Sequence, residues 1–333
     1  MRKVWVACIV VACRGEPSTA PVDAAASAPP VAVGTAPSTG RGPRRYRVDE
    51  DKQQPEVAPV APAYASGDAA YREPDCEKLE DVSALRDAHV AGRLRATVEG
   101  LARARYPTGL AFLRAQDDAQ LGAWFRRVPE TFEGVVSRFD AAVHEGSHVW
   151  RAKRFDPRRE KEVFPVRSDL VIETRHLATF PRSEIIAEHV DAAADPYVKI
   201  YLEGASGTQG FETVLDEYQA YAHSLAARYC TRDLIPRGQR VSARDGILTF
   251  MYYVEVYLAV ARARHPKAYA DIMRDAGHRR MILAVWDRAE FWLRKSRDEQ
   301  ALGVGDGRIA TWVYEASRLA EIASVRERDG GSE

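Results

Sequence analysis

Three features are scarce in this sequence of 333 residues, and each scarcity excludes a class of protein. Only four residues are Cys, at positions 8, 13, 76 and 230, which is too few for a scaffold built on disulfides. Basic and acidic residues balance at 48 each, so the chain lacks the basic excess of a general nucleic-acid binder. The apolar runs are shorter than the ~20 residues of a membrane-spanning helix. Hydrophobic residues make up 46% of the chain, which excludes wholesale disorder and predicts a sizeable core.

The first 13 residues have the pattern of an export signal. Arg2 and Lys3 form a positively charged start, and the apolar stretch Val4–Ala12 leads to Cys13. This pattern resembles a bacterial lipoprotein signal, in which the Cys is diacylated and becomes the mature N-terminus. The resemblance implies a protein held at the bacterial cell envelope, on the periplasmic or outer-membrane face, by its lipid anchor only. An ordinary secretory signal, which would give a secreted protein, is the alternative.

Proline is concentrated in the segment that follows. Ten of the 18 Pro residues lie before residue 76, among many Ala, Ser, Thr and Gly residues. Such a composition shows no helical or strand period, and its frequent Pro favours an extended, solvated chain. Residues 14–75 are therefore predicted to be a disordered linker between the anchor and a folded domain.

Helical periodicity dominates from Cys76 onward. The predicted helices are Glu77–Leu101, Thr108–Phe125, Phe139–Arg151, Phe211–Tyr229, Arg244–Arg264, His278–Lys295 and Arg308–Arg328. β-branched and aromatic residues at 163–174 and 197–202 predict a strand-bearing insertion, followed by a glycine-rich loop. The expected fold is one domain, residues 76–333, mainly α with a small β insertion.

Two further observations concern the core of this domain. The apolar run Gly246–Ala261 contains Glu255 and is flanked by arginines, so it predicts a central core helix. Removal of a signal would leave Cys76 and Cys230 as the only thiols besides Cys13. In an exported protein they suggest a disulfide between the start of the domain and a later helix. Two free buried thiols are the alternative.

Residues 144–148 read His-Glu-Gly-Ser-His, and this motif carries a possible chemistry. Residues four apart project from one face of a helix, so His144 and His148 can place two imidazole nitrogens on one metal ion. Zinc suits these ligands, and a catalytic zinc site has three protein ligands and a fourth position open to water. Glu145, next to the first ligand, is placed to accept a proton from that water. A pair of core histidines in an ordinary helix is the alternative.

The motif resembles that of the HExxH zinc metallopeptidases, the zincins. The metzincin continuation of the motif would require Gly and His where this chain has Arg151 and Arg154. What remains resembles a gluzincin, whose third zinc ligand is a Glu on a later helix. The resemblance implies a helical, zincin-like domain that acts as a zinc-dependent peptidase on a peptide or protein substrate, with Glu145 as general base.

The predicted helix over 211–229 offers the third ligand. One of its faces is apolar apart from one carboxylate and carries Val214, Glu217, Tyr218, Tyr221 and Leu225. Another face is polar, is expected to be solvated and carries Glu212, Asp216, Gln219 and His223. A carboxylate directed at the core is costly unless it is paired or coordinates a metal. Glu217 is therefore the predicted ligand, with Glu212 as second choice and Asp216, the aspzincin pattern, as third.

Two questions stay open on the sequence alone. Zincins often supply a Tyr, His or Arg donor to the oxyanion of the tetrahedral intermediate, and Tyr221, His223 and Tyr201 are candidates. Each of them has packing or surface exposure as its alternative role. A different function also fits the sequence: a non-catalytic envelope lipoprotein, with a binding or scaffold domain in which HEGSH is incidental or structural.

Overall fold

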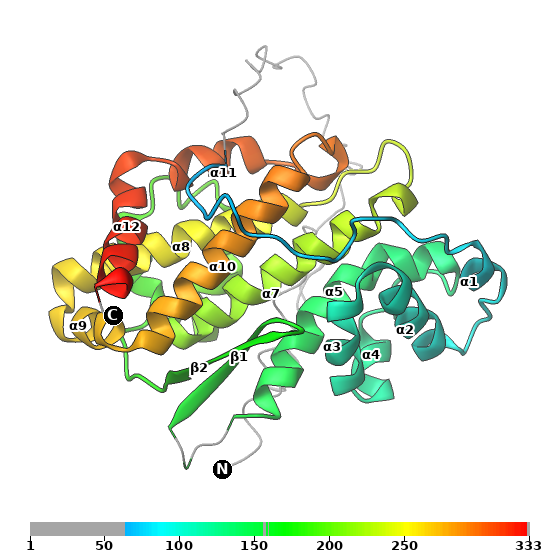
Figure 1. The fold of residues 1–333 in the computed structure, drawn as a ribbon, viewed down its shortest axis with the longest axis horizontal. Coiled ribbons are helices and arrows are strands. Elements are labelled where there is room, and N and C mark those ends of the chain that lie inside the picture. The colour runs from blue at the N-terminus through cyan, green and yellow to red at the C-terminus, as the bar shows by residue number, and fades with distance from the viewer. Residues whose placement is uncertain (1–63, 156–157, 159, 332–333) are drawn as a thin grey trace, which may run out of the picture. The chain divides into compact units, whose positions relative to one another are not determined.

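The computed structural model describes residues 64–155, 158 and 160–331 of the chain. The predicted signal, Cys13 and residues 14–63 of the predicted linker lie outside the described residues. The described part is mostly helical and carries a two-stranded antiparallel sheet (Figure 1). This confirms the expected fold class, mainly α with a small β insertion.

Short helices precede and pack against the helix that contains the HEGSH motif. The elements are α1 (Ser83–Asp87), α2 (Leu94–Arg105), the 3-10 turn η1 (Pro107–Gly109), α3 (Leu110–Ala115), α4 (Asp118–Ala123) and α5 (Phe132–Ala152). The motif helix α5 begins where the hydroxyl of Thr131 accepts a hydrogen bond from the Gly134 amide at 3.1 Å. Both α2 and α3 pack against α5.

Two of the predicted helices are each divided in this region. The stretch 108–125 is broken because the Asp117 carboxylate accepts from the Gln120 amide, while the Gln120 side chain accepts from the Asp117 amide. This reciprocal capping box starts a new helix inside an amphipathic run. The stretch 77–101 is broken before α2, where Gly92 has a φ of 83°, in the left-handed region.

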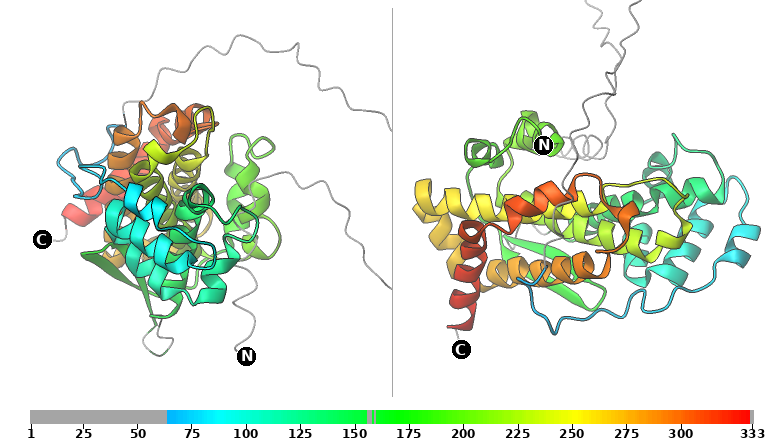
Figure 2. Two further views of the ribbon diagram at one scale, coloured as in Figure 1. Left: turned by 90° about the vertical axis from the view of Figure 1, so that its right-hand side faces the viewer. Right: turned by 90° about the horizontal axis from the view of Figure 1, so that it is seen from above.

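The insertion between α5 and the next long helix contains the sheet. Strands β1 (Lys161–Arg167) and β2 (Leu170–Arg175) pair antiparallel, with Phe164 opposite Ile172, and both of these side chains are buried. The chain then forms the turns η2 (Arg182–Glu188) and η3 (Val198–Leu202) and the short helix α6 (Gly204–Gly207). Figure 2 shows this green segment beside α8 (Ala243–Arg264), against which η2 packs.

The prediction of a strand over 197–202 is wrong. Val198–Leu202 forms a turn of π-helix, and the glycines that follow it begin α6. The rings of Tyr197 and Tyr201, four residues apart, stack at 6.1 Å between centroids. Aromatic and β-branched residues favour a strand only weakly, and here the packing of Tyr201 against Phe250 of α8, with 4.9 Å between ring centroids, prevails.

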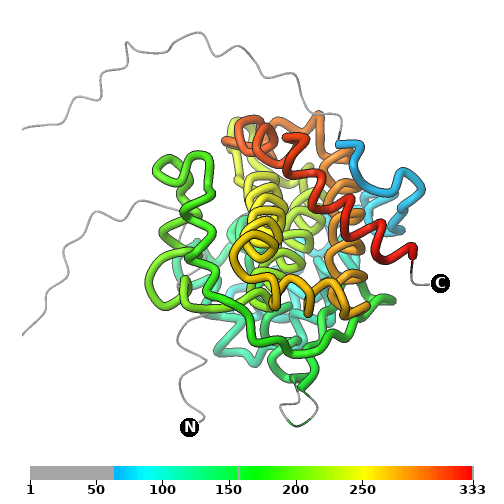
Figure 3. Tube along the Cα trace, turned by 90° about the vertical axis from the view of Figure 1, so that its left-hand side faces the viewer, coloured from blue at the N-terminus to red at the C-terminus, as the bar shows by residue number. Residues whose placement is uncertain are grey.

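Long helices form the centre of the described part. They are α7 (Phe211–Cys230), α8, α9 (Pro266–Arg274), α10 (Ala276–Lys295), α11 (Asp306–Val313) and α12 (Ala316–Gly330), with the 3-10 turns η4 (Arg232–Leu234) and η5 (Gln300–Leu302). Helix α7 packs against α5, α8 and α10, and the tube in Figure 3 shows α8 and α10 among these central helices. The predicted helix over 308–328 is divided between α11 and α12 at Glu315, which has an extended backbone.

Helix α8 is long and apolar enough to cross a membrane by length and composition. Within the structure, however, 83% of its most apolar 18-residue window is buried. The helix therefore lies where the sequence predicted, as the central helix of the core. Burial of each of its large apolar side chains stabilises the fold by about 1.5–3 kcal/mol.

The segment before α1 is packed on the helical body, although residues 64–75 were assigned to the linker. Arg294 of α10 donates to the Tyr64 carbonyl at 2.9 Å, and Arg288 of the same helix donates to the buried Glu73 carboxylate at 2.6 Å. The structure also joins Cys76 and Cys230 in a disulfide, with 5.3 Å between their Cα atoms. The folded region thus begins earlier than composition indicated, because contacts of this segment with α10, the buried ion pair among them, outweigh the local Pro and Ala content.

Candidate metal centre

The three side chains predicted as metal ligands meet between α5 and α7. The Nε2 atoms of His144 and His148 lie 3.1 Å apart, and Oε2 of Glu217 lies 3.3 Å from the first and 3.5 Å from the second. One ligand atom from each residue lies within 4.8 Å of the other two, so the group could hold a metal ion. The two histidines are buried, and the Glu217 side chain is 13% exposed.

This convergence follows from the antiparallel packing of α5 on α7. His144 contacts Ser224, the Ser147 hydroxyl accepts from Gln219, and His148 contacts Asp216, so partner numbers fall along α7 as they rise along α5. These polar residues therefore form a ladder of contacts along the shared face of α5 and α7.

The third residue of the motif must be small. A Cβ atom on Gly146 would lie 2.5 Å from the carbonyl oxygen of Phe112 and 2.6 Å from Nε2 of Gln116. That Gln116 amide also donates to the carbonyl of Ala142 at 2.9 Å. The glycine thus allows the close approach of α3 to the back of the motif helix, which fixes the direction of its histidines.

The other nitrogen of each imidazole has a protein partner. Nδ1 of His144 lies 3.0 Å from the Ser224 hydroxyl, and Nδ1 of His148 lies 2.9 Å from the Asp216 carboxylate. Asp216 in turn accepts from Arg151 at 3.0 Å. With Nδ1 engaged, both rings present Nε2 to the common point, which is the arrangement that orients histidine ligands in metal sites.

Opposite charges determine the protonation of this cluster when no metal is bound. Burial opposes a charged imidazole, but the Asp216 and Glu217 carboxylates outweigh burial and raise the pKa of His148 well above its usual range. Burial likewise disfavours a charged Glu217, yet His148 and His144 hold the pKa of that carboxyl well below its usual value. The pKa of Asp216 is lowered too, because Arg151 and His148 outweigh its burial.

The residues present fit a metal ion. Oε2 of Glu217 is buried and has no hydrogen-bond partner among the described residues, although two imidazole nitrogens face it. Buried carboxylate oxygens are normally satisfied, and a cation shared with the two imidazoles would satisfy this one. Two imidazoles and one carboxylate are a donor set that transition metals accept. Glu145 is 1% exposed and lies beside His144 on α5.

Of the three candidate oxyanion donors, the two tyrosines lie near the cluster. The ring of Tyr221 meets the ring of His144 edge-on, with 4.7 Å between centroids. Its hydroxyl lies 2.7 Å from the hydroxyl of Tyr201, which is fully buried. The pair therefore forms an aromatic layer beside the first ligand.

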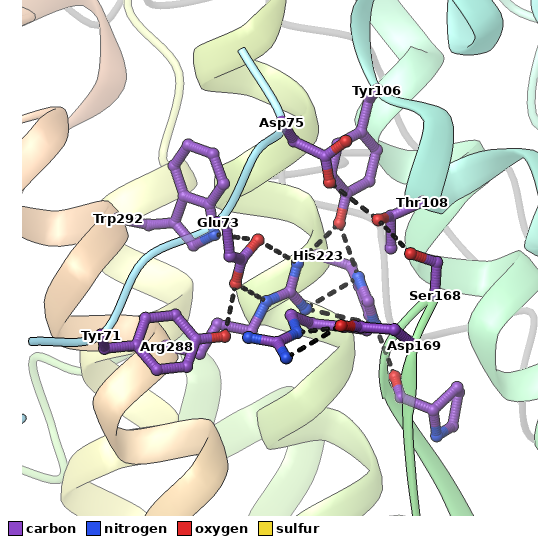
Figure 4. Close-up of polar contacts among 12 residues, drawn as sticks. Tyr71, Glu73, Asp75, Tyr106, Thr108, Ser168, Asp169, His223, Arg288 and Trp292 are labelled. Carbon is purple, nitrogen blue, oxygen red and sulfur yellow. Dashed lines mark hydrogen bonds and ion pairs between the residues drawn. The ribbon is translucent and has the colours of Figure 1, made fainter. Parts of the chain in front are cut away.

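His223 has a structural role, which argues against its candidacy as a donor. Its Nε2 donates to the Pro165 carbonyl at 2.7 Å, so Nδ1 is the acceptor toward the Tyr106 hydroxyl at 2.7 Å and Arg288 at 2.9 Å (Figure 4). Burial and the charge of Arg288 lower the pKa of this imidazole well below its usual range. Both nitrogens of the neutral ring are thus committed to the fold.

The predicted solvated face of α7 is wrong as well. Its four residues are buried, at 9% exposure or less: Glu212, Asp216, Gln219 and His223. The carboxylate of Glu212 accepts from the Leu177 amide at 2.7 Å and takes no part in the cluster. These polar side chains can be buried because α5, the β-hairpin and the 177–180 segment supply them with hydrogen-bond partners. Amphipathic periodicity cannot reveal such partners.

The sequence did not predict the roles that two residues of the centre have in the structure. Asp216 was considered only as a ligand, and Ser224 was not considered at all, yet they hold the two imidazoles. A usable signal was present only for Ser224, which lies on α7 seven residues, or two helical turns, after Glu217. Searches of protein-family models, curated proteins and solved structures found no match to this chain. The candidate centre therefore rests on its own geometry.

Proposed function

We propose that this protein is a zinc-dependent hydrolase, most simply a peptidase, with its centre at His144, His148 and Glu217. The observation that carries the proposal is the meeting of these three side chains from two helices 69 residues apart in the chain, from His148 to Glu217. Helical geometry alone brings the two histidines together. The arrival of a buried carboxylate at the same point is the independent support.

Zinc is the metal that this donor set favours. Two imidazoles and one carboxylate occur in catalytic zinc sites, where a fourth position remains for water. When bound, zinc supplies Lewis acidity, which polarises a carbonyl and lowers the pKa of a coordinated water to about 7.

The chain's own residues would divide the remaining work. Ser224 and Asp216 hold the imidazoles in one orientation through Nδ1. In the proposed reaction, the carboxylate of Glu145 accepts the proton of the attacking water and then delivers it to the leaving amine. In the same proposal, Tyr221, whose ring contacts the His144 ring, would donate its hydroxyl hydrogen bond to the oxyanion. His144, Glu145 and His148 are buried, and the lower local dielectric strengthens the electrostatic interactions of these side chains.

We also infer that the protein is exported and held at the bacterial envelope by a lipid on Cys13. The residues of this signal lie outside the described part, so its support is the sequence pattern together with the disulfide between Cys76 and Cys230. Disulfides persist in oxidising compartments such as the periplasm. Radiolabelled palmitate should be incorporated by the wild-type chain and not by Cys13→Ser. Equal labelling of both would overturn the anchor.

Metal analysis of the purified protein, combined with a peptide-library cleavage assay, tests the enzyme directly. We expect about one zinc per chain, loss of zinc in His148→Ala, and loss of hydrolysis with retained zinc in Glu145→Gln. The last variant is the decisive control, because it changes one carboxylate without removing a ligand. A chain that binds no metal and keeps its stability in chelator would instead be the non-catalytic envelope lipoprotein. A chain that binds zinc without hydrolysing any peptide would use the ion structurally.

A further inference from the structure

Arg182, the first residue of η2, is a buried cation without a carboxylate partner in the part of the chain that the structure describes. The residue is 2% exposed, and its Nε donates to the Ser206 carbonyl at 2.9 Å. Its Nη1 is buried and has no hydrogen-bond partner among the described residues. No ion pair to Arg182 forms within that part of the chain either.

Other buried arginines of this protein behave differently. Arg288 pairs with Glu73, Arg105 pairs with Asp233, and each pair forms hydrogen bonds of 2.9 Å or shorter. This is the usual arrangement, because an unpaired charge in a protein interior is very costly. A buried guanidinium that keeps open donors is therefore expected where an anion arrives from outside the chain.

Arg182 lies one aromatic layer away from the candidate metal centre. Its guanidinium carbon is 5.5 Å from the centroid of the Tyr201 ring. The Tyr201 hydroxyl meets that of Tyr221 at 2.7 Å, and the Tyr221 ring contacts the His144 ring. Burial lowers the pKa of Arg182, and the strongest opposing charge is the carboxylate of Glu217. Contacts and charge both place the guanidinium on the side of the cluster where Tyr201 and Tyr221 stand.

We propose that Arg182 binds a carboxylate group of the substrate, on the side of the candidate metal centre where Tyr201 and Tyr221 lie. This inference rests on the proposed hydrolase. The planar guanidinium forms two parallel hydrogen bonds with a carboxylate, and in a peptide that carboxylate is the C-terminus or an acidic side chain. The oxyanion of the reaction is a poorer match, because it exists only transiently, whereas Arg182 is charged and buried throughout. Arg182 would thus determine specificity, and the substrates would be anionic peptides.

A pair of small probes separates this role from metal binding. 2-Benzyl-3-mercaptopropanoate and its amide carry the same zinc-binding thiol and differ only in the carboxylate. Zinc content of the full-length protein is measured first, and the dissociation constants of both probes are then measured by calorimetry. We expect the carboxylate to bind about tenfold or more tightly than the amide, as a charge-assisted hydrogen bond requires.

Arg182→Gln should remove this preference while leaving the affinity for the amide unchanged. Arg182→Lys, which keeps the charge, should retain part of it, and Arg264→Gln should behave as wild type. Arg264 is the matched control because it is half-exposed and pairs with Glu188 at the other end of η2. The comparison of the two probes on the wild-type protein remains decisive if Arg182→Gln does not fold.

The outcomes distinguish the two proposals. Absence of zinc overturns the hydrolase, and the substrate inference fails with it. If zinc is bound, then equal affinities for the two probes, no binding of either probe, or equal weakening of both probes in Arg182→Gln overturns the role of Arg182 alone. Peptides with free or amidated C-termini, and with Glu or Gln side chains, would then show which carboxylate supplies the anion.

Discussion

Substitution of Asp216 by Asn tests whether the residues around the cluster were correctly assigned. Asp216 holds Nδ1 of His148 at 2.9 Å and is itself held by Arg151 at 3.0 Å. The substitution preserves the size of the side chain and one acceptor oxygen but removes the negative charge that makes the imidazole a better ligand. Loss of such a partner lowers metal affinity by about 10–100-fold. Because Asn keeps one acceptor oxygen, we expect zinc affinity to fall by about tenfold, the low end of this range. That corresponds to ~1.4 kcal/mol of binding free energy.

A competition titration against a chromophoric zinc chelator measures this change. Asp233→Asn is the matched control, since Asp233 also pairs with an arginine, Arg105, and lies just beyond the C-terminal end of α7. We expect the control to bind zinc as the wild type does, although it loses some stability. Circular dichroism of both metal-free variants verifies that they are folded. If folded Asp216→Asn binds zinc within twofold of wild type, then Asp216 does not orient a ligand and the description of the centre is wrong.

Two predictions concern stability and need no metal. Replacement of Arg288 by Met leaves the buried carboxylate of Glu73 without its cation, so urea unfolding with the disulfide intact should show a loss of about 3–5 kcal/mol. The same change at Arg308, whose ion pair has side chains 46% and 41% exposed, should cost at most about 1 kcal/mol, and equal costs would contradict the ranking by burial. Burial raises the pKa of Glu255 well above its usual value, so the folded state holds a proton that the unfolded state releases above its own, ordinary pKa. Wild type should therefore lose stability relative to Glu255→Gln as the pH rises above ~4.5, by up to about 1.4 kcal/mol per pH unit until the folded pKa is reached, and a constant difference between pH 5 and pH 7 would refute this.

Much of the centre was readable from the sequence because its geometry is local. The spacing of His144 and His148 places both rings on one helix face whatever the rest of the chain does. Glu217 was identified because it is a carboxylate on a helix face that is otherwise apolar. The long helices α7, α8 and α10 were found near their true ends, since strong periodicity persists over many turns.

Interruptions of helices were predicted poorly, for reasons that are also physical. The Asp117 capping box begins a new helix, and the left-handed Gly92 lies in the break before α2. Each break depends on one or two residues, whereas periodicity is judged over many residues. The turn at 198–202 was assigned to a strand because its residue types favour one, whereas stacking of Tyr197 and Tyr201 favours a helical turn. Local preferences of this size are readily outweighed by tertiary contacts.

The sequence by itself determined the helical class, the core position of α8 and the two imidazoles of the motif, because these depend on periodicity and spacing along one element. Only the tertiary structure decided that Cys76 meets Cys230, that His223 is held in a buried network and that Arg182 contacts the Tyr201 ring. Each of these depends on residues distant in the chain, whose proximity follows from the packing of several elements at once. Local spacing therefore indicated a chemistry, and long-range packing brought Glu217 and its neighbours to the two imidazoles.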